Sequence, residues 1–206
     1  MPDKIDFKKI HKALYAPPAG RFVEVEVPPL TYLMVDGTGD PNTANSYQAA
    51  VEWLYSVSYP LKFASKKELG RDYAVMPLEG LWWADDMSTF LTRDKAKWSW
   101  TMMILQPDWI TREMVDAATE KASEKLGTRP ASLRLESLEE GLSVQTLHIG
   151  SYDDEGPVLA RLHDEYLPRH GLVETGHHHE IYLGDPRRTA PERLRTILRQ
   201  PVRRMT

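Results

Sequence analysis

The sequence predicts an α+β protein with antiparallel sheets, for three reasons. Residues 22–27 alternate apolar and charged side chains, as half-buried strands do. Tyr47, Val51 and Leu54 recur at helical spacing after a turn-rich stretch. The order strand, strand, helix, strand, strand then occurs twice along the chain, which indicates an internal structural duplication.

The first half contains four expected strands and one helix. Pro28 and Pro29 separate the first two strands, which are placed so that they could form a hairpin. Glu79 and Gly80 are expected to form a turn, and residues 85–97 a polar loop. The expected segments are a polar lead-in at 1–20, strands at 22–27, 31–36, 73–78 and 98–106, and a helix from about 42 to 63.

A linking helix is expected at residues 112–126, because Thr111 can cap its start and Gly127 can end it. Pro191 suits the first turn of a short final helix. The expected segments of the second half are strands at 132–136, 142–149, 172–175 and 178–183, and helices at 156–170 and 191–198.

Residues 1–206 are therefore expected to form a single domain. Its two pseudo-repeats lie at about 21–106 and 131–184, and a tail follows at 186–206. The halves would join their sheets, with helices over one face and a ligand cleft on the other. No heptad seam is visible, so the oligomeric state stays open.

Charge and composition narrow the classes of function. The formal net charge is −4, which argues against a broad grip on nucleic acid. The tail is locally rich in arginine, and these side chains are expected to pair with acidic groups of the same fold or to be solvated. No apolar run approaches the length of a membrane span. The absence of cysteine excludes disulfides and thiolate chemistry, and a cytoplasmic location fits.

The strand at 178–183 brings ionisable groups together. Because alternate residues share a face, His178, Glu180 and Tyr182 lie together, whereas Ile181 suits a helix-covered core on the opposite face. A carboxylate beside a phenol can hydrogen-bond a ligand, attract a cation, or serve as acid and base. Residues 177–179 are all histidine, but adjacent residues point to opposite faces, so no metal site and no cofactor are expected.

Aromatic residues gather in the middle of the chain. Four of the six tryptophans lie between positions 82 and 100. Each suits either the core or the wall of an aromatic ligand pocket, and strand period does not separate these two interpretations. The four are Trp82, Trp83, Trp98 and Trp100.

Two acidic pairs and a glycine-containing segment receive structural interpretations. Residues 85–86 and 139–140 are expected to be turn and surface charges. The segment from Asp36 to Asp40 contains two glycines, but its spacing matches no phosphate-binding fingerprint, so we interpret it as a tight turn.

Four segments together resemble the stand-alone GyrI-like proteins, and the resemblance covers essentially the whole chain. They are PPLTYLMVDGTGDPN, PLEGLWW, WSWTMMILQPDWIT and HHHEIYLGDPRRTAPERLRTILRQPV. The resemblance implies tandem strand-helix-strand-strand modules with a ligand cleft at their junction. It also implies a hydrophobic, aromatic or cationic small molecule as the binding partner.

In this family a carboxylate in the cleft is typical, and Glu180 looks like it. Some stand-alone members hydrolyse cyclopropane-bearing compounds that alkylate DNA, and so detoxify them. The resemblance then implies that Glu180 activates water, that Tyr182 or Tyr152 donates a proton, and that the four tryptophans stack on the substrate. Tyr55 and His178 are further expected ligand contacts. The alternatives are a binding or sensing module without turnover, and a protein-interaction domain similar to the gyrase inhibitor.

Overall fold

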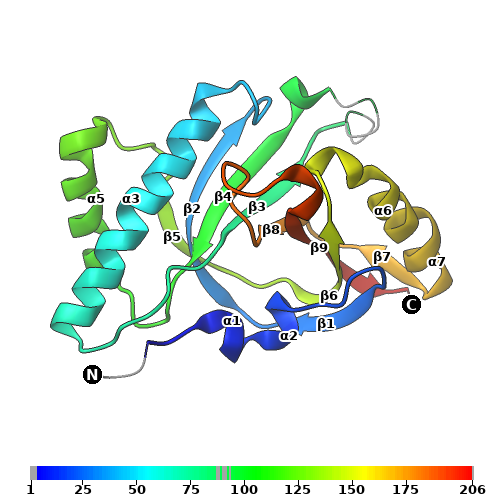
Figure 1. Ribbon diagram of the computed structural model, residues 1–206, viewed down its shortest axis with the longest axis horizontal. Coiled ribbons are helices and arrows are strands. Elements are labelled where there is room, and N and C mark those ends of the chain that lie inside the picture. Colours follow the sequence, from blue (N-terminus) through cyan, green and yellow to red (C-terminus); the bar gives the residue numbers. More distant parts are fainter. Residues whose placement is uncertain (1–3, 87–88, 90–91, 93, 206) are drawn as a thin grey trace.

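The computed structural model describes residues 4–86, 89, 92 and 94–205. In this part of the chain, nine strands run antiparallel to their hydrogen-bonded neighbours (Figure 1). The strands are β1 (Val23–Val27), β2 (Leu30–Thr38), β3 (Leu78–Trp83), β4 (Ser99–Leu105), β5 (Arg134–Leu138), β6 (Gly141–Ile149), β7 (Leu172–Glu174), β8 (His178–Tyr182) and β9 (Arg195–Arg204). The prediction of an α+β fold with antiparallel pairing is confirmed.

The helices include two long ones, α3 and α5, and an irregular one later in the chain. A π-helical turn, η3, interrupts the irregular helix between α6 and α7. The described helices are α1 (Phe7–Ile10), α2 (Lys12–Tyr15), α3 (Asn45–Glu68), α5 (Arg112–Leu126), α6 (Gly156–Ala160), η3 (Arg161–Tyr166) and α7 (Leu167–Arg169), with short 3-10 turns at η1 (Lys95–Lys97), η2 (Tyr152–Asp154) and η4 (Pro191–Arg193).

The strand order reveals two units with the same topology. Hydrogen bonds place the strands in the order β1-β6-β9-β8-β3-β4-β2-β5, and β7 adds to the far end of β9. The first unit is β2, α3, β3 and β4, and the second is β6, the helix from α6 to α7, β8 and β9. In each unit the last strand lies between the other two. The units meet where β3 pairs with β8, at the centre of the sheet.

Several expected elements differ from the observed ones because tertiary pairing outweighs local signals. The strands at 22–27 and 31–36 do not form a hairpin: β1 pairs with β6, whereas β2 pairs with β4 and β5. The strand expected at 73–78 begins only at Leu78, after Pro77, and runs through the expected turn at Glu79 and Gly80. Proline has no backbone N–H to donate to a ladder, so the strand starts behind it.

The two ends of the chain also correct the prediction. The second half of the short helix expected at 191–198 is strand, because β9 lies between β6 and β8 and bonds to both. The expected tail is therefore an interior strand. The lead-in at 1–20 forms α1 and α2, which bury Leu14 and Tyr15. The linking helix agrees with prediction: α5 begins after the Thr111 cap and ends at Gly127, whose φ is 82°.

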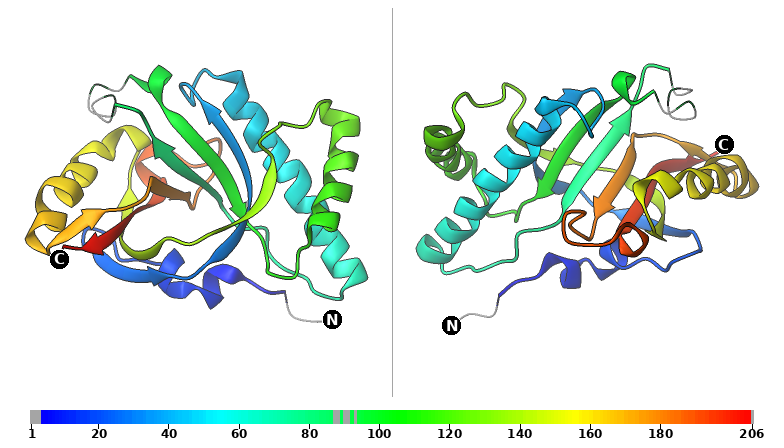
Figure 2. Two further views of the ribbon diagram at one scale, coloured as in Figure 1. Left: turned by 180° about the vertical axis from the view of Figure 1, so that it is seen from behind. Right: turned by 45° about the horizontal axis from the view of Figure 1, so that its top comes forward.

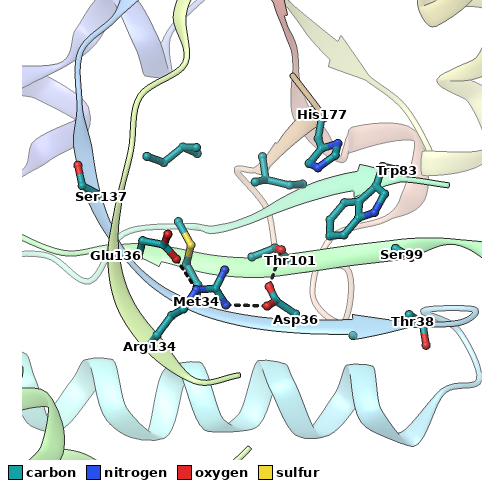
Figure 3. Close-up of a pocket in the computed structure, with 13 residues that line it drawn as sticks. Met34, Asp36, Thr38, Trp83, Ser99, Thr101, Arg134, Glu136, Ser137 and His177 are labelled. Atoms are coloured by element: carbon teal, nitrogen blue, oxygen red, sulfur yellow. Dashed lines mark hydrogen bonds and ion pairs between the residues drawn. The ribbon is translucent and has the colours of Figure 1, made fainter. Parts of the chain in front are cut away.

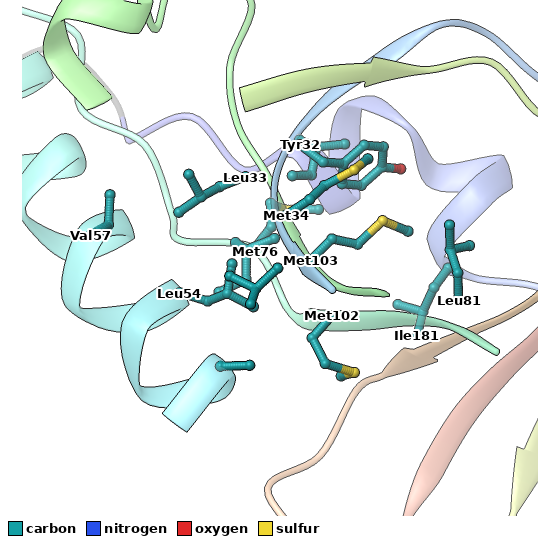
Figure 4. Packing of buried hydrophobic residues seen from close by; sticks show 14 of the residues in the cluster. Tyr32, Leu33, Met34, Leu54, Val57, Met76, Leu81, Met102, Met103 and Ile181 are labelled. Carbon is teal, nitrogen blue, oxygen red and sulfur yellow. The ribbon is translucent and has the colours of Figure 1, made fainter. Parts of the chain in front are cut away.

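The two units place their helices over the same face of the sheet. Leu54 and Val57 of α3 lie on the side toward which Leu33 points, whereas Tyr32 points the other way (Figure 4). The helix from α6 to α7 buries its own apolar side chains in a second, smaller core. This second core contains Val144, Leu162, Leu167, Leu172 and Val202. α5 packs beside α3, and α1 and α2 lie across the other face (Figure 2).

Glu180 lies on the face that carries the helices, and Ile181 on the opposite one. Tyr47 of α3 contacts Trp82 and Trp100, which share a face with Glu180 in the ladder from β4 through β3 to β8. Ile181 therefore does not lie in the core beneath the long helices, where the strand pattern had placed it. Strand period separates the two faces of β8 but does not identify which one the long helices cover.

A buried network of charges lies behind the centre of the sheet. His179 of β8 bonds through Nε2 to Glu79 (2.9 Å) and through Nδ1 to Glu140 (2.9 Å). Arg199 of β9 donates to the other oxygen of Glu140 at 3.0 Å, and Tyr15 of α2 donates to Glu79 at 2.7 Å. Glu140 was expected at the surface, but its side chain is only 3% exposed. The network joins β3, β8 and β9 to α2 and to the residue before β6.

The substitution Glu140→Gln tests how much this network contributes to the stability of the fold. The substitution keeps the shape of the side chain but removes the negative charge between His179 and Arg199, so two buried cations lose a partner. We expect the free energy of unfolding to fall by about 3 kcal/mol. Urea denaturation measures it, with the exposed neighbour variant Glu139→Gln as the control. Equal stabilities of the two variants would contradict this role.

The network also predicts how stability depends on pH. Burial alone would lower the pKa of His179, but Glu140 and Glu79 outweigh it and raise the pKa from 6.5 to about 9. Its contribution is therefore complete below pH 6.5 and is lost as the pH rises through about 9. Burial would raise the pKa of Glu140, but His179 and Arg199 lower it from 4.5 to about 2. That contribution is present above pH 4.5 and is lost as the pH falls through about 2.

Urea midpoints measured from pH 2 to pH 10 should therefore pass through a plateau between pH 4.5 and 6.5 and fall on either side. A His179→Gln variant should lack the alkaline fall that wild type shows. A wild-type midpoint that stays constant from pH 6.5 to 9.5 would mean that His179 carries no charge in the folded protein.

Candidate functional site

A chain of hydrogen bonds connects β3 to β8 on the helix-covered face. The indole Nε1 of Trp82 donates to the hydroxyl of Tyr182 at 2.9 Å. That hydroxyl donates its own proton to Oε2 of Glu180 at 2.7 Å. Because a tyrosine hydroxyl carries a single proton, Tyr182 is fully used as a donor. One carboxylate oxygen of Glu180 is therefore held in place by this chain.

Aromatic rings from both units surround the hydrogen bonds that link Trp82, Tyr182 and Glu180. Tyr47, in the first turn of α3, stacks on Trp82 with ring centroids 6.2 Å apart, and Trp98 meets Trp82 edge-on at 5.9 Å. Tyr152, just before α6, meets Tyr182 edge-on at 5.6 Å. Each unit thus supplies a tyrosine from the start of its helix. In the sequence, Tyr47 indicates only a helix, and its place in the first turn of that helix is the one signal that could have marked it as a site residue.

The tyrosines of the site remain protonated at neutral pH. Burial, followed by the charge of Glu180, raises the pKa of Tyr182 well above 10. Burial and then Glu180 raise the pKa of Tyr47 in the same way. Burial, together with Glu155, Glu180 and Asp185, raises the pKa of Tyr152 to about 12. The three hydroxyls are thus proton donors rather than bases, and the proton of Tyr182 is already given to Glu180.

His178 lies beside Glu180 in the same layer. Its Nε2 is 3.5 Å from Oε1 of Glu180, and its side chain is 10% exposed. Neither ring nitrogen has a hydrogen-bond partner among the described residues. Oε1 of Glu180 and Nε2 of His178 therefore face each other, and neither atom takes part in the hydrogen bonds that link Trp82, Tyr182 and Oε2 of Glu180.

The other predicted site residues lie at varying distances from Glu180. Trp100 is fully buried beneath Tyr47, and its ring packs so closely on Gly37 that a Cβ there would lie 2.1 Å from it. Trp100 is thus a floor for the site rather than an exposed wall. Tyr55 lies two turns along α3 from Tyr47 and contacts the exposed Tyr59, with ring centroids 6.2 Å apart.

Trp83 points to the opposite face, where it lines a separate pocket of about 520 Å³ (Figure 3). The imidazole of His177 stacks on its indole with centroids 4.3 Å apart. On the other side of this pocket Arg134 bonds to both Asp36 and Glu136. Asp36 therefore belongs to a strand that lines a pocket, and not to the tight turn expected from the sequence.

The described residues offer little support for a metal site or a membrane span. No three of their histidine, aspartate and glutamate side chains are grouped so that they could hold an ion. None of the helices in the described ranges combines the length and the apolar character that a bilayer crossing requires.

Comparisons with known proteins agree with this architecture. Residues 22–203 match the family described as GyrI-like small molecule binding domain. An uncharacterized conserved protein from Listeria innocua is 40% identical, over 97% of this chain and 100% of its own, with a TM-score of 0.88. Two further structures from Listeria innocua, each described as a hydrolase, are 38% identical over 98% and 97% of this chain and 100% of their own, with TM-scores of 0.85 and 0.84. A comparison with curated proteins gives no significant match.

Tyr182→Phe tests the hydrogen-bond chain. The variant leaves the Trp82 indole without its acceptor and Glu180 without its donor in a partly buried layer. We expect the free energy of unfolding to fall by about 1–2 kcal/mol. One of the six indole N–H signals in an NMR spectrum, that of Trp82, should also shift. The exposed Tyr59→Phe is the control, and six unmoved indole signals in Tyr182→Phe would contradict the chain.

Proposed function

The chain belongs to the family of GyrI-like small-molecule binding domains, and we propose that it is a hydrolase that adds water to reactive, hydrophobic aromatic molecules at Glu180. The observation that carries this proposal is the carboxylate itself. Glu180 is held through one oxygen by Tyr182, is partly buried, and lies among aromatic rings. Relatives described as hydrolases, at 38% identity, support a hydrolytic reaction.

The hydrogen bonds divide the catalytic roles among the residues. Oε2 of Glu180 is occupied by Tyr182, which leaves Oε1 to remove a proton from water. Tyr182 cannot also protonate a substrate, since its proton is committed to Glu180. No described residue is hydrogen-bonded to the hydroxyl of Tyr152, whose pKa of about 12 keeps it protonated. Tyr152 is therefore the proton donor in our proposal, and Tyr182 positions the base.

A cyclopropane conjugated to a carbonyl suits this arrangement of groups. Water attacks a ring carbon while Oε1 of Glu180 takes its proton, and a C–C bond of the cyclopropane breaks. The electron pair moves through the conjugated system to the carbonyl oxygen, which becomes a phenolate that Tyr152 protonates. The net change is the addition of one water molecule. The rings of Trp82, Trp98 and Tyr47 offer stacking surfaces to such a planar substrate.

Binding without turnover is the second candidate, and the local charge favours it. Glu155, Glu180 and Asp185 all act on the pKa of Tyr152, so three carboxylates lie near the same hydroxyl. Such a site attracts organic cations through charge and through the aromatic faces, with no chemical step. A sensing or sequestering domain needs no more than this.

A turnover assay separates the two candidates. Wild-type protein, Glu180→Gln and Tyr152→Phe are incubated with a cyclopropane-bearing duocarmycin-type alkylator, and mass spectrometry follows the water adduct. We expect both variants to lose about 100-fold or more in kcat, the usual weight of a general base or acid. Tryptophan fluorescence measures binding in parallel, and Kd should change little because both variants keep the aromatic rings.

Glu52→Gln, an exposed carboxylate variant on α3, is the matched control and should retain wild-type turnover. Fluorescence quenching by wild type with no water adduct would leave the binding function and refute hydrolysis. Full turnover by Glu180→Gln would remove Glu180 from the mechanism.

A further inference from the structure

His178 is a buried ionisable side chain for which the proposed reaction has so far no use. It is nine-tenths buried, and both of its ring nitrogens lack a hydrogen-bond partner in the described part of the chain. Buried polar atoms are nearly always satisfied by protein or by water. The 3.5 Å between His178 Nε2 and Glu180 Oε1 is too long for a good direct hydrogen bond, but it allows one water molecule to contact both atoms.

Glu174 continues the line of ionisable groups beyond His178. β7 and β8 follow one another along β9, where Glu174 pairs with Val202 and Glu180 with Leu198. These partners are an even number of residues apart, so Glu174 and Glu180 share a face of the sheet. His178, two residues from Glu180, lies on that face between them. The hydrogen bond from His163 lowers the pKa of Glu174 against the opposing effect of burial, and the nearby His178 lowers this pKa further.

His163 completes the line at the surface. It comes from the π-helical turn η3, which lies over this face, and its Nδ1 is 2.6 Å from Oε1 of Glu174. Both residues line a surface pocket of about 290 Å³ beside α7. π-turns within helices are frequently found at functional sites, because the wider turn redirects a side chain. Here it accompanies an imidazole that reaches a strand carboxylate.

Such a line would serve the step that returns the proposed hydrolase to its starting protonation state. After water has been added, Glu180 holds the proton that it removed, and Tyr152 has given its proton to the product. Tyr152 regains a proton from solvent, and Glu180 must release one before the next turnover. Glu180 is partly buried beneath aromatic rings, so direct exchange of its proton with bulk water is hindered.

We propose that His178 relays this proton from Glu180 to Glu174 and His163, and so out to solvent. The inference rests on the proposed hydrolysis. Nε2 of His178 accepts the proton of Glu180 through the shared water, and Nδ1 releases the opposite proton toward Glu174. The imidazole ends unchanged after its ring turns or exchanges protons. In this role His178 acts on the base and is not the ligand contact that was expected from the sequence.

Imidazole rescue tests this role. His178→Ala should bind the ring-opened water adduct of the alkylator as wild type does, within about twofold in Kd by tryptophan fluorescence. Its kcat should fall about 100-fold, the lower end of acid–base contributions. Free imidazole in the buffer should restore kcat in proportion to its concentration. His178→Gln, which can hydrogen-bond but cannot carry a proton, should stay slow without imidazole. The exposed His170→Ala is the control.

The possible outcomes distinguish a failure of the proton relay from a failure of the proposed hydrolysis. Normal kcat in both His178 variants would refute the relay and leave the hydrolase standing. Loss of adduct binding together with kcat, and no rescue by imidazole, would mean that His178 only maintains structure, which also refutes the relay. No turnover by wild type would refute the hydrolase, and the relay with it.

Discussion

The ion pairs of His179 with Glu79 and Glu140 are the constraint on which the centre of this fold depends. With carboxylates at both ring nitrogens, the imidazole is held as a cation in a fully buried place. Breaking such a network leaves uncompensated charges inside the protein, which costs far more than the loss of a surface pair. The two units are therefore joined at β3 and β8 by charge as well as by the backbone ladder, and α2 closes over the joint through Tyr15.

The same strand carries the candidate chemistry on its other face. His179 and Glu180 are neighbours in β8, and strand period sends one behind the sheet and the other toward the helices. A slip of β8 by one residue would bury Glu180 among the charges and bring His179 out to the aromatic layer. The buried ion pairs oppose that slip, because only His179 has partners in place behind the sheet. Stability and site geometry are thus coupled through one register.

Much of the fold and of the candidate site could be predicted from the sequence, but only where the signal came from neighbouring residues. The period of β8 was enough to group His178, Glu180 and Tyr182, and the Thr111 cap and Gly127 defined α5. What it could not supply were pairings between distant segments. Glu140 looked like a surface charge beside Glu139, because its partners His179 and Arg199 lie far along the chain. β9 looked like a helix because Pro191 suits a first turn, whereas strands on both sides determine its conformation.

The duplication also explains why only one of the two central strands, β8, places a carboxylate on this face of the sheet. In the β3–β8 ladder Trp82 and Tyr182 occupy corresponding positions of the two units, and Gly80 is paired with Glu180. A Cβ at Gly80 would lie 2.9 Å from the Trp82 indole nitrogen and 3.1 Å from the Met102 sulfur, so the first unit has no room for a side chain there. A second carboxylate would in any case repel the first at this distance. The symmetric frame thus provides aromatic rings from both units, while the charge comes from one unit alone. Under the proposed function, a planar molecule bound between the rings would meet the carboxylate of Glu180 from the second unit alone, and this asymmetry would set its orientation.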